Sequence, residues 1–405
     1  MNTVSDTTTS QVPSHVPPEL VREFDFKKEI VGPDSYVEYK KLHQLPDIFY
    51  TPHQGGHWVV TRYDDMEYVF KTAAEFSSKN ALIPKGARPM NILPLESDAP
   101  LHTYYRTILQ PFFTPEATLR LEKQINDFTE ELINELYPRG ECEFMSDFAL
   151  KMPIRLFMRL VDLPDADVPQ LIEYANGFFH GETSEIQHAS TAQMIGYVAQ
   201  KLQERAQNPG DDLLSAVVKG KAEGGRPLTE MEMLGMATVL LLGGLDTVAS
   251  TLGWIALFLA RNPGHRQQLV NDPKLINNAL EEIMRRHHIG CLAREVRDDM
   301  VYKGITMKAG DMVLIPTPAA GLDERRFPDP FTVDFNRDDK LHLIFGRGPH
   351  ACIGQLLGRF ELRAFLRGWL KRIPEFSLKP GSDPSNYVTG ITHSLKELHL
   401  QWKVQ

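Results

Sequence analysis

The sequence predicts a mainly α-helical protein with small β-sheets near both ends. The longest run of helical character, 229–261, is almost wholly apolar. Further runs with helical spacing cover 64–76, 119–136, 154–160, 167–205, 273–286 and 355–371. Alternation typical of short strands covers 57–62, 300–316 and 376–404. Apolar residues that recur every three to four positions indicate helices packed on a core, whereas period-two alternation indicates half-buried strands.

Composition narrows the class of protein. The 405 residues are 42% hydrophobic and 24% charged, and the net charge of −9 argues against general nucleic-acid binding. The three cysteines, Cys142, Cys291 and Cys352, form no paired spacing, which fits a reducing cytoplasm. No linker divides the chain, so we expect a flexible segment, 1–20, and one domain, 21–405. Nothing indicates an obligate oligomer, and a monomer is expected.

The apolar stretch 236–260 is long enough to imitate a membrane span. A charge at a bilayer centre is costly, so Asp246 in its middle favours a buried core helix. The first 20 residues are polar and lack the pattern of a signal peptide. We therefore expect a soluble, cytoplasmic protein with no membrane partner.

The segment 345–354, FGRGPHACIG, ends in one cysteine at the mouth of a predicted helix. A helix N-terminus stabilises a thiolate, and a thiolate is a ligand of haem iron. Gly346, Gly348 and Gly354 permit tight turns against a flat cofactor. A buried structural cysteine is the alternative for Cys352.

Paired glycines, Gly243 and Gly244, lie inside the long apolar run and precede Asp246 and Thr247. A glycine in a helix interior costs about 1 kcal/mol relative to alanine, so the pair is expected to make room for a ligand. Thr247 can bond to a carbonyl of the preceding turn and bend the helix. An acid beside an alcohol can deliver protons to a buried site. A close helix contact with a satisfied buried aspartate is the alternative.

Two further sets of polar residues are candidates for supporting roles. A buried ion network is predicted from Glu282, Arg285 and Arg337, of which the first two lie one helical turn apart. Donors that can hold two carboxylates are His102, Arg106, Arg294 and His350.

These motifs, in this order, resemble the cytochrome P-450 family over about 41–402 of the chain. They are HTYYR (102–106), GGLDT (243–247), EIMR (282–285), FPDPFTVDFNR (327–337) and FGRGPHACIG (345–354). Sequence segments such as LLLGGLDTV and LKRIPEF are similar to those of the soluble bacterial camphor-hydroxylase branch. The resemblance implies the cytochrome P-450 fold, a helical bundle around a buried haem b with a long central helix.

The resemblance also implies roles for the candidate residues. Cys352 would be the axial ligand of the haem iron, and Asp246 and Thr247 would deliver protons during oxygen activation. The haem propionates would be held by His102, Arg106, Arg294 and His350. The cysteine loop would be supported by Glu282, Arg285 and Arg337.

Members of the family that act as peroxygenases usually lack the acid–alcohol pair. The resemblance therefore implies a monooxygenase that uses O2 and two electrons from a small [2Fe-2S] ferredoxin with its reductase. Because such ferredoxins are acidic, docking needs a local basic patch, for which Arg106, Arg347 and Arg359 are candidates. Scattered surface arginines are the alternative.

Alignment with the same branch implies a substrate wall. Its members would be Leu82, Met90, Val239, Leu242, Gly243, Gly290, Ile391 and Thr392. Met90 stands where the camphor hydroxylases carry a tyrosine that bonds the substrate ketone, and a thioether cannot donate. Gly290 replaces a larger residue. We therefore expect a small apolar molecule bulkier than camphor, such as a terpenoid or norisoprenoid ketone.

The stretch 169–200 contains no lysine or arginine, although this branch ties its catalytic aspartate to basic residues there. His180 aligns with the missing arginine, so a titratable pair of His180 with Asp246 is predicted. A haem-thiolate peroxygenase or isomerase is the enzymatic alternative. A haem-binding sensor without turnover comes from another class, and a metal site of His287, His288 and Cys291 is the weakest interpretation.

Overall fold

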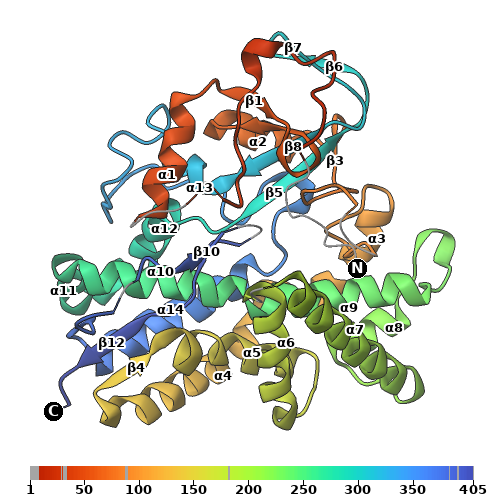
Figure 1. Cartoon of the computed structure of the whole chain (residues 1–405). Coiled ribbons are helices and arrows are strands. Elements are labelled where there is room, and N and C mark those ends of the chain that lie inside the picture. Colours follow the sequence, from red (N-terminus) through yellow and green to blue (C-terminus); the bar gives the residue numbers. More distant parts are fainter. Residues whose placement is uncertain are drawn as a thin grey trace.

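The computed structural model describes residues 9–28, 30, 34–86, 90–180, 183–382, 384–389 and 392–404. Figure 1 shows a smaller part rich in strands above a larger helical part, with α9 and α10 crossing the helical part in line. The helices are α1 (Ser35–Lys41), α2 (Tyr63–Lys71), α3 (Leu101–Leu109), α4 (Pro115–Leu136), α5 (Lys151–Leu160), α6 (Val168–His180), α7 (Ser184–Gln207), α8 (Leu213–Lys219), α9 (Glu230–Leu245), α10 (Thr247–Arg261), α11 (Pro263–Asn271), α12 (Ile276–Arg286), α13 (Thr317–Ala320) and α14 (Gln355–Arg372).

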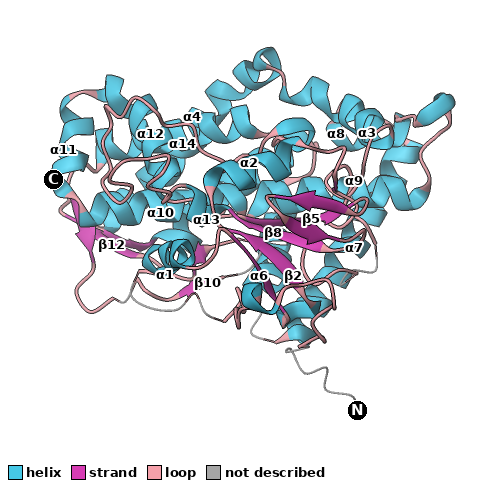
Figure 2. Cartoon of the chain, turned by 90° about the horizontal axis from the view of Figure 1, so that it is seen from above, coloured by secondary structure: helices cyan, strands magenta, loops and turns pink. Residues whose placement is uncertain are grey.

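The main sheet has the strand order β1-β2-β8-β5-β3, and only the β2–β8 pair is parallel. Its strands are β1 (Ile48–Thr51), β2 (His57–Val60), β3 (Phe76–Ser77), β5 (Cys291–Val296) and β8 (Met312–Pro316). The small sheets contain β4 (Glu141–Glu143), β6 (Met300–Tyr302), β7 (Ile305–Met307), β9 (Phe376–Leu378), β10 (Tyr387–Val388), β11 (Ser394–Leu395) and β12 (His399–Trp402). Figure 2 shows the sheet of β2, β8 and β5 apart from β12, which lies near the C-terminus. The prediction of a mainly α fold with small sheets is confirmed.

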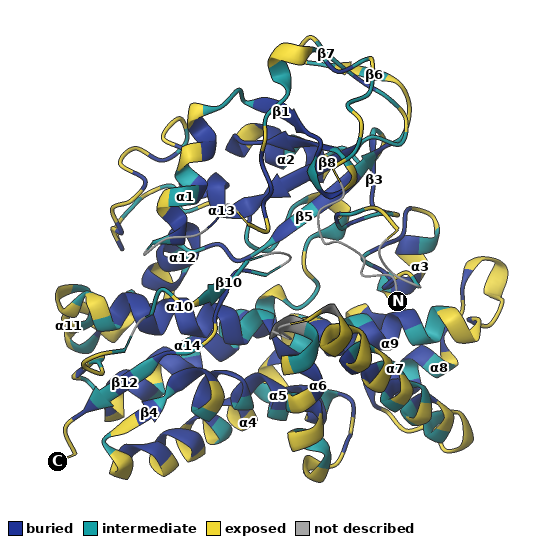
Figure 3. Cartoon of the chain, viewed as in Figure 1, coloured by how far each residue is buried: buried dark blue, intermediate teal, exposed yellow. Residues whose placement is uncertain are grey.

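Two hydrophobic cores meet along the central apolar run. Leu252 and Ile255 of α10 belong to the core that includes the main sheet, whereas Met236 and Leu241 of α9 belong to the core of the helices α3 and α5–α9. Figure 3 shows both helices in dark blue over much of their length. Much of both helices packs against protein on more than one side, which accounts for the apolar character of the run.

By length and composition, Glu230–Arg261 is one helical run able to cross a membrane, but 56% of its most apolar window is buried inside the protein. A core helix of a soluble protein passes the same test. The packing on both sides therefore agrees with the core helix that the sequence predicts.

Residues 9–20 differ from the flexible segment expected at the N-terminus. The amide of Ser10 donates to the carbonyl of Pro52 at 2.9 Å, and Nε2 of His15 lies 2.8 Å from Oδ2 of Asp311. Val16 is only 5% exposed. Proline restricts the backbone before folding, so this proline-rich stretch loses little entropy when it packs beside the sheet.

Candidate active site

The cysteine loop turns sharply before α14, as the glycine pattern predicts. Gly346 and Gly348 have φ values of 65° and 70°, a region that favours glycine. A Cβ on Gly348 would lie 2.7 Å from the carbonyl oxygen of Phe70, so only glycine fits there. The amide of Cys352 donates to the carbonyl of Phe345 at 2.8 Å and closes the loop.

The Cys352 side chain is exposed at a cavity of about 300 Å³. The cavity is lined by Arg106, Gln110, Phe113, Cys352, Ile353, Gln355, Leu356 and Arg359. Desolvation by the surrounding protein raises the pKa of the Cys352 thiol, while the backbone N–H of Gly354 and the charges of Arg106 and Arg359 oppose that rise. A metal ion at this sulfur would favour the thiolate further.

Both arginines of this cavity are fixed by bonds to the protein. Nη1 of Arg106 donates to the carbonyl of Ala351 at 2.8 Å, directly before the cysteine. Arg359 makes a bidentate pair with Glu281 at 2.7 and 3.0 Å. Burial opposes ionisation of Glu281, but hydrogen bonds from His342 and Arg359 hold its pKa at about 2. Sequence reasoning missed Glu281 and His342, because nothing local distinguishes them from surface residues.

The four predicted carboxylate donors form one cluster. The rings of His102 and His350, from α3 and the cysteine loop, have centroids 3.9 Å apart. Burial, followed by the charge of Arg106, lowers the pKa of His102 to about 4. Burial, followed by the charge of Arg294, lowers the pKa of His350 to about 3. Burial also lowers the pKa of Arg294 to about 10.

This cluster has the donor set of a site for anionic groups. Nε2 of His102 is buried and has no hydrogen-bond partner among the residues that the structure describes. A buried donor without a partner loses its hydration without compensation. Burial first, and then the charges of the neighbouring arginines, disfavours the cationic form of both histidines. Two carboxylates would relieve both effects, so the residues fit the propionates of a haem that Cys352 would hold by its sulfur.

The central helical run breaks at Asp246, where the sequence predicts one bent helix. α9 ends at Leu245 and α10 begins at Thr247, with Asp246 at φ −109° and ψ −37°. The hydroxyl of Thr247 donates to the carbonyl of Gly243 at 3.0 Å, as the sequence predicts, and thereby takes up an acceptor at the break. Asp246 itself is 2% exposed.

The two glycines of this break have different surroundings. A Cβ on Gly244 would lie 2.8 Å from Cδ2 of Phe157 on α5. A Cβ on Gly243 would meet nothing within 4 Å. Gly244 therefore permits close packing of two helices, which is the alternative left open above, whereas Gly243 borders open space beside Thr247. The two sequence interpretations apply to one glycine each.

The predicted ion network is present below the cysteine loop. Glu282 and Arg285 have no solvent exposure, and Nε and Nη2 of Arg285 donate to Glu282 at 2.8 and 3.0 Å. Nε of Arg337 donates to the same carboxylate at 3.0 Å. Arg285 also donates to the carbonyls of Gly321 and Pro330. The network ties α12 to the irregular segment that leads to Cys352.

The predicted substrate wall comes from several separate elements. Gly290 and Thr392 pair through an isolated antiparallel bridge. The loop that carries Met90 reaches α9, because the amide of Leu93 donates to the carbonyl of Gly235 at 3.3 Å. Half-buried side chains include Leu82, Met90 and Val239, and Leu242 is buried. Ile391 and the side chain of His180 lie outside the described residues.

The alternative metal site is not assembled. Among the described residues, His287 contacts the carbonyl of Ile283, His288 accepts from the amide of Leu343, and Cys291 contacts the hydroxyl of Tyr39. These three side chains therefore have separate partners.

One histidine and two carboxylates have the spacing of a metal site but form an ion network. Ligand atoms of His43, Asp323 and Glu324 lie within 4.8 Å of one another. Arg62 donates to both carboxylates at 3.1 Å, and Lys40 pairs with Glu324. These cations neutralise the oxygens that a metal would need.

Comparisons with known proteins agree with this site. The family model described as Cytochrome P450 matches residues 149–404. The probable cytochrome P-450 127A1 of Sinorhizobium fredii is 33% identical, and the alignment covers 97% of each chain. The crystal structure of CYP101J2 is 35% identical with a TM-score of 0.88 over 98% of this chain and all of that chain. That of CYP101C1 is 32% identical with a TM-score of 0.88 over 97% and 100%.

The fold and the cysteine loop define a haem-thiolate protein. The chain belongs to the cytochrome P-450 family, and the resemblance to its soluble bacterial class is confirmed. It is a cytochrome P-450 monooxygenase that uses haem b, a small-molecule substrate, O2 and a redox partner. The bound haem supplies the activation of O2, and the protein supplies ligation, orientation and protons.

Proposed function

We propose that this enzyme hydroxylates a small apolar molecule, a terpenoid or norisoprenoid ketone, in the cytoplasm. One atom of O2 enters a C–H bond, and the other leaves as water. The balance requires two electrons and two protons for each turnover. The electrons come singly from a [2Fe-2S] ferredoxin that its reductase recharges.

The proposal assigns each residue a task. Cys352 would hold the haem iron through its sulfur, and Arg106 fixes the loop through its bond to Ala351. His102, Arg106, Arg294 and His350 would donate hydrogen bonds to the haem propionates. Glu282, Arg285 and Arg337 hold the loop in place as positioning residues.

The helix break at Asp246 and Thr247 is the observation that supports O2-dependent turnover. The Thr247 hydroxyl has its hydrogen donated to Gly243, so its oxygen can accept another hydrogen bond on the side of the open space. Asp246 lies next to it as an ionisable group. This arrangement supports proton delivery to a site beside Gly243. A sensor that only binds haem has no need of such a pair.

A substrate larger than camphor is supported by two positions of the predicted wall. Gly290 carries no side chain, and the nearest atom to a Cβ placed there would be Oγ1 of Thr317 at 3.7 Å. Met90 is half-buried and offers a flexible thioether in place of a donor. The shape of the pocket, rather than a hydrogen bond from Met90, therefore orients the substrate.

Ferredoxin docking is proposed at the face that carries Cys352. Arg106, Arg347 and Arg359 are all half-buried there, and Arg359 is paired with Glu281. Their net positive potential is therefore reduced by the protein itself. The CYP101-type structural neighbours support a ferredoxin as the partner.

The first experiment is the absorption spectrum of the dithionite-reduced, CO-bound protein. We expect a strongly red-shifted Soret band in the wild type and its loss in Cys352→Ser. Cys142→Ser, at a buried cysteine away from the cavity, should keep the shifted band. A histidine-type band in the wild type would mean that Cys352 does not bind the haem iron and has a structural role.

The second experiment measures the coupling of O2 consumption to product. A panel of terpenoid ketones is first titrated against the ferric enzyme, and the ligand that drives it to high spin becomes the test substrate. Thr247→Ala should keep O2 consumption and lose most product. Thr251→Ala is the matched control, because its hydroxyl donates to the carbonyl of Thr247 at 2.9 Å one turn further on. Full turnover with peroxide and no reductase would favour a peroxygenase instead.

The pairing of Asp246 with His180 rests on the absence of lysine and arginine from 169–200. A titrating histidine there would change coupling between about pH 6 and 7. We expect His180→Arg to flatten this profile. A flat profile in the wild type as well would reject the pair.

A further inference from the structure

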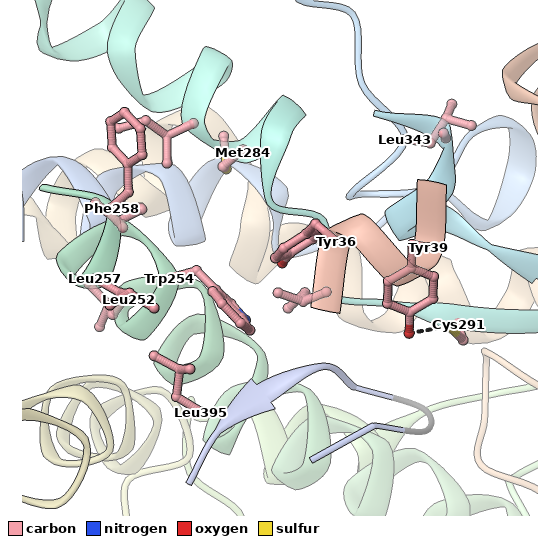
Figure 4. Packing of buried hydrophobic residues seen from close by; sticks show 14 of the residues in the cluster. Tyr36, Tyr39, Leu252, Trp254, Leu257, Phe258, Met284, Cys291, Leu343 and Leu395 are labelled. Carbon is pink, nitrogen blue, oxygen red and sulfur yellow. Dashed lines mark hydrogen bonds between the residues drawn. The ribbon is translucent and has the colours of Figure 1, made fainter. Parts of the chain in front are cut away.

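A second cavity, of about 220 Å³, lies between α1, the last turns of α10 and the end of α12. Its lining shares no residue with the cavity at Cys352. Tyr36 of α1 and Trp254 and Phe258 of α10 line this cavity, and Figure 4 shows Trp254 beside Tyr36. Arg286 and Phe331 also line it.

Arg286 is the feature of this cavity that needs a ligand. It is the last residue of α12 and is 6% exposed. Its Nη1 is buried and has no hydrogen-bond partner among the described residues. Oδ2 of Asp34 lies 3.6 Å from Nη2, beyond normal hydrogen-bond length. A buried guanidinium donor without an acceptor is costly, so an acceptor in the cavity would be bound strongly.

Two aromatic rings lie close to this guanidinium. The carbon of the guanidinium lies 5.0 Å from the ring centroid of Tyr36 and 4.7 Å from that of Phe331. These cation–π contacts hold the guanidinium of Arg286 in place. Its N–H groups form a fork that matches a carboxylate, and Nη1 has no other hydrogen-bond partner among the described residues.

The charges around the cavity select a single negative charge. Arg261 and Arg286 bring two positive charges to the lining, and Asp34 brings one negative charge. His287 is neutral, because burial lowers its pKa well below the ordinary value. The net charge of these lining residues is therefore +1, which one monoanion neutralises.

The shape of the cavity selects a flat ligand. Trp254 and Tyr36 meet edge to face with ring centroids 5.0 Å apart, and Trp254 lies nearly parallel to His287 at 6.1 Å. Planar walls of this kind favour a ring that stacks or meets them by an edge. A volume of about 220 Å³ is below the ~300–1,000 Å³ of drug-sized sites, so one ring is the limit.

We propose that this cavity is a second binding site, distinct from the haem site, for a small aromatic monocarboxylate whose carboxylate accepts hydrogen bonds from Arg286. The ring lies among Tyr36, Trp254 and Phe258. The site does not depend on the substrate proposed for the haem pocket.

The cavity is connected to the predicted substrate wall through a chain of hydrogen bonds. Nε1 of Trp254 donates to the carbonyl of His393 at 2.9 Å, and the amide of His393 donates to the carbonyl of Ile289 at 2.7 Å. Thr392 and Gly290 are the adjacent residues. Binding in the cavity must therefore be separated from binding at the haem in any test.

The test uses 4-bromobenzoate with the haem-loaded enzyme. Crystals grown with this probe are measured at the bromine absorption edge, and calorimetry gives its affinity in solution. The Soret band is recorded in the same titration to detect any ligand at the haem. We expect a bromine peak beside Trp254, with the carboxylate of the probe bound to Arg286. Binding at this site should not require a change in the spin state of the haem iron.

Variants decide whether Arg286 is the anchor. Arg286→Met should weaken binding by about ten- to hundredfold, the loss expected for a hydrogen bond to a charged group. Arg155→Gln, at an arginine on α5 that pairs with Glu131, should leave the affinity unchanged. The uncharged 4-bromobenzyl alcohol should bind far more weakly than the acid.

Several outcomes would overturn the proposal. They are a bromine peak only in the haem pocket, equal affinity for the acid and the alcohol, or an unchanged affinity in Arg286→Met. If Arg286→Met does not fold, Arg261→Gln provides the same test at an exposed position and should weaken binding several-fold. An unchanged affinity there, with the acid and alcohol equal in the wild type, would reject the site.

Discussion

The paired glycines of the central helix allow a matched substitution test. A glycine-to-alanine change in a helix interior stabilises by about 1 kcal/mol through helix propensity alone. The same gain is available at Gly243 and at Gly244, which are neighbours at the end of α9. Any difference between the two variants therefore reports the tertiary surroundings.

The structure gives these surroundings directly. At Gly244 a Cβ would lie 2.8, 3.2 and 3.4 Å from Cδ2, Cγ and Cβ of Phe157. Because the contact includes the base of the Phe157 side chain, rotation of the ring alone does not relieve it. Overpacking of a core costs about 1–3 kcal/mol. At Gly243 nothing lies within 4 Å, so no such cost arises.

We expect Gly244→Ala to be less stable than Gly243→Ala by about 1–3 kcal/mol. The free energy of unfolding is measured in urea by far-UV circular dichroism, with the Soret band as a second probe of the same transition. Gly243→Ala should also alter the spin-state titration with apolar ligands, because its methyl group enters the open space beside Thr247. Equal stabilities, or a more stable Gly244→Ala, would refute the assignment of close packing to Gly244.

Three further predictions concern the ion network, a buried histidine and the cysteine loop. Arg285→Met leaves Glu282 without its main partner and should cost about 3–5 kcal/mol in urea unfolding. The cost should exceed that of Arg337→Gln, since Arg337 is 13% exposed and donates only one hydrogen bond to Glu282, whereas Arg285 donates two. Burial lowers the pKa of His57 to about 3, so the unfolded state binds its proton first as the pH falls. Stability should then fall by up to about 1.4 kcal/mol per pH unit between about pH 6.5 and 3, and His57→Phe should remove this part of the acid sensitivity in urea melts at pH 7 and 5. Gly348→Ala places a Cβ 2.7 Å from the carbonyl oxygen of Phe70 and should lower the ratio of haem to protein in the purified enzyme, whereas Gly346→Ala, whose nearest atom is 3.9 Å away, should lower it less.

Each of these comparisons has a contrary result. Equal costs for Arg285→Met and Arg337→Gln would mean that burial of the pair does not decide its strength. An unchanged pH dependence in His57→Phe would mean that this histidine is not neutral in the folded protein. Equal haem content in the two glycine variants would mean that the loop shifts to accept a side chain at Gly348.

The sequence by itself determined the features that depend on neighbouring residues. The length of the apolar run 229–261 predicts a buried helix, because strands are much shorter. The bond from Thr247 to Gly243 spans one turn, so it is readable from the chain. The turns at Gly346 and Gly348 need a positive φ that glycine adopts readily. The family resemblance rests on these same local motifs in their order.

The tertiary structure decided what depends on surfaces from distant elements. Phe157 of α5 distinguishes Gly244 from Gly243, although the two glycines are adjacent in the sequence. The pairing of Arg359 with Glu281 and the unpartnered edge of Arg286 depend on how α12 packs against its neighbours. Local sequence patterns do not predict these contacts, because periodicity and hydrogen bonds within one turn involve residues only a few positions apart. The burial of a side chain and the charges around it depend instead on segments that are distant in the sequence.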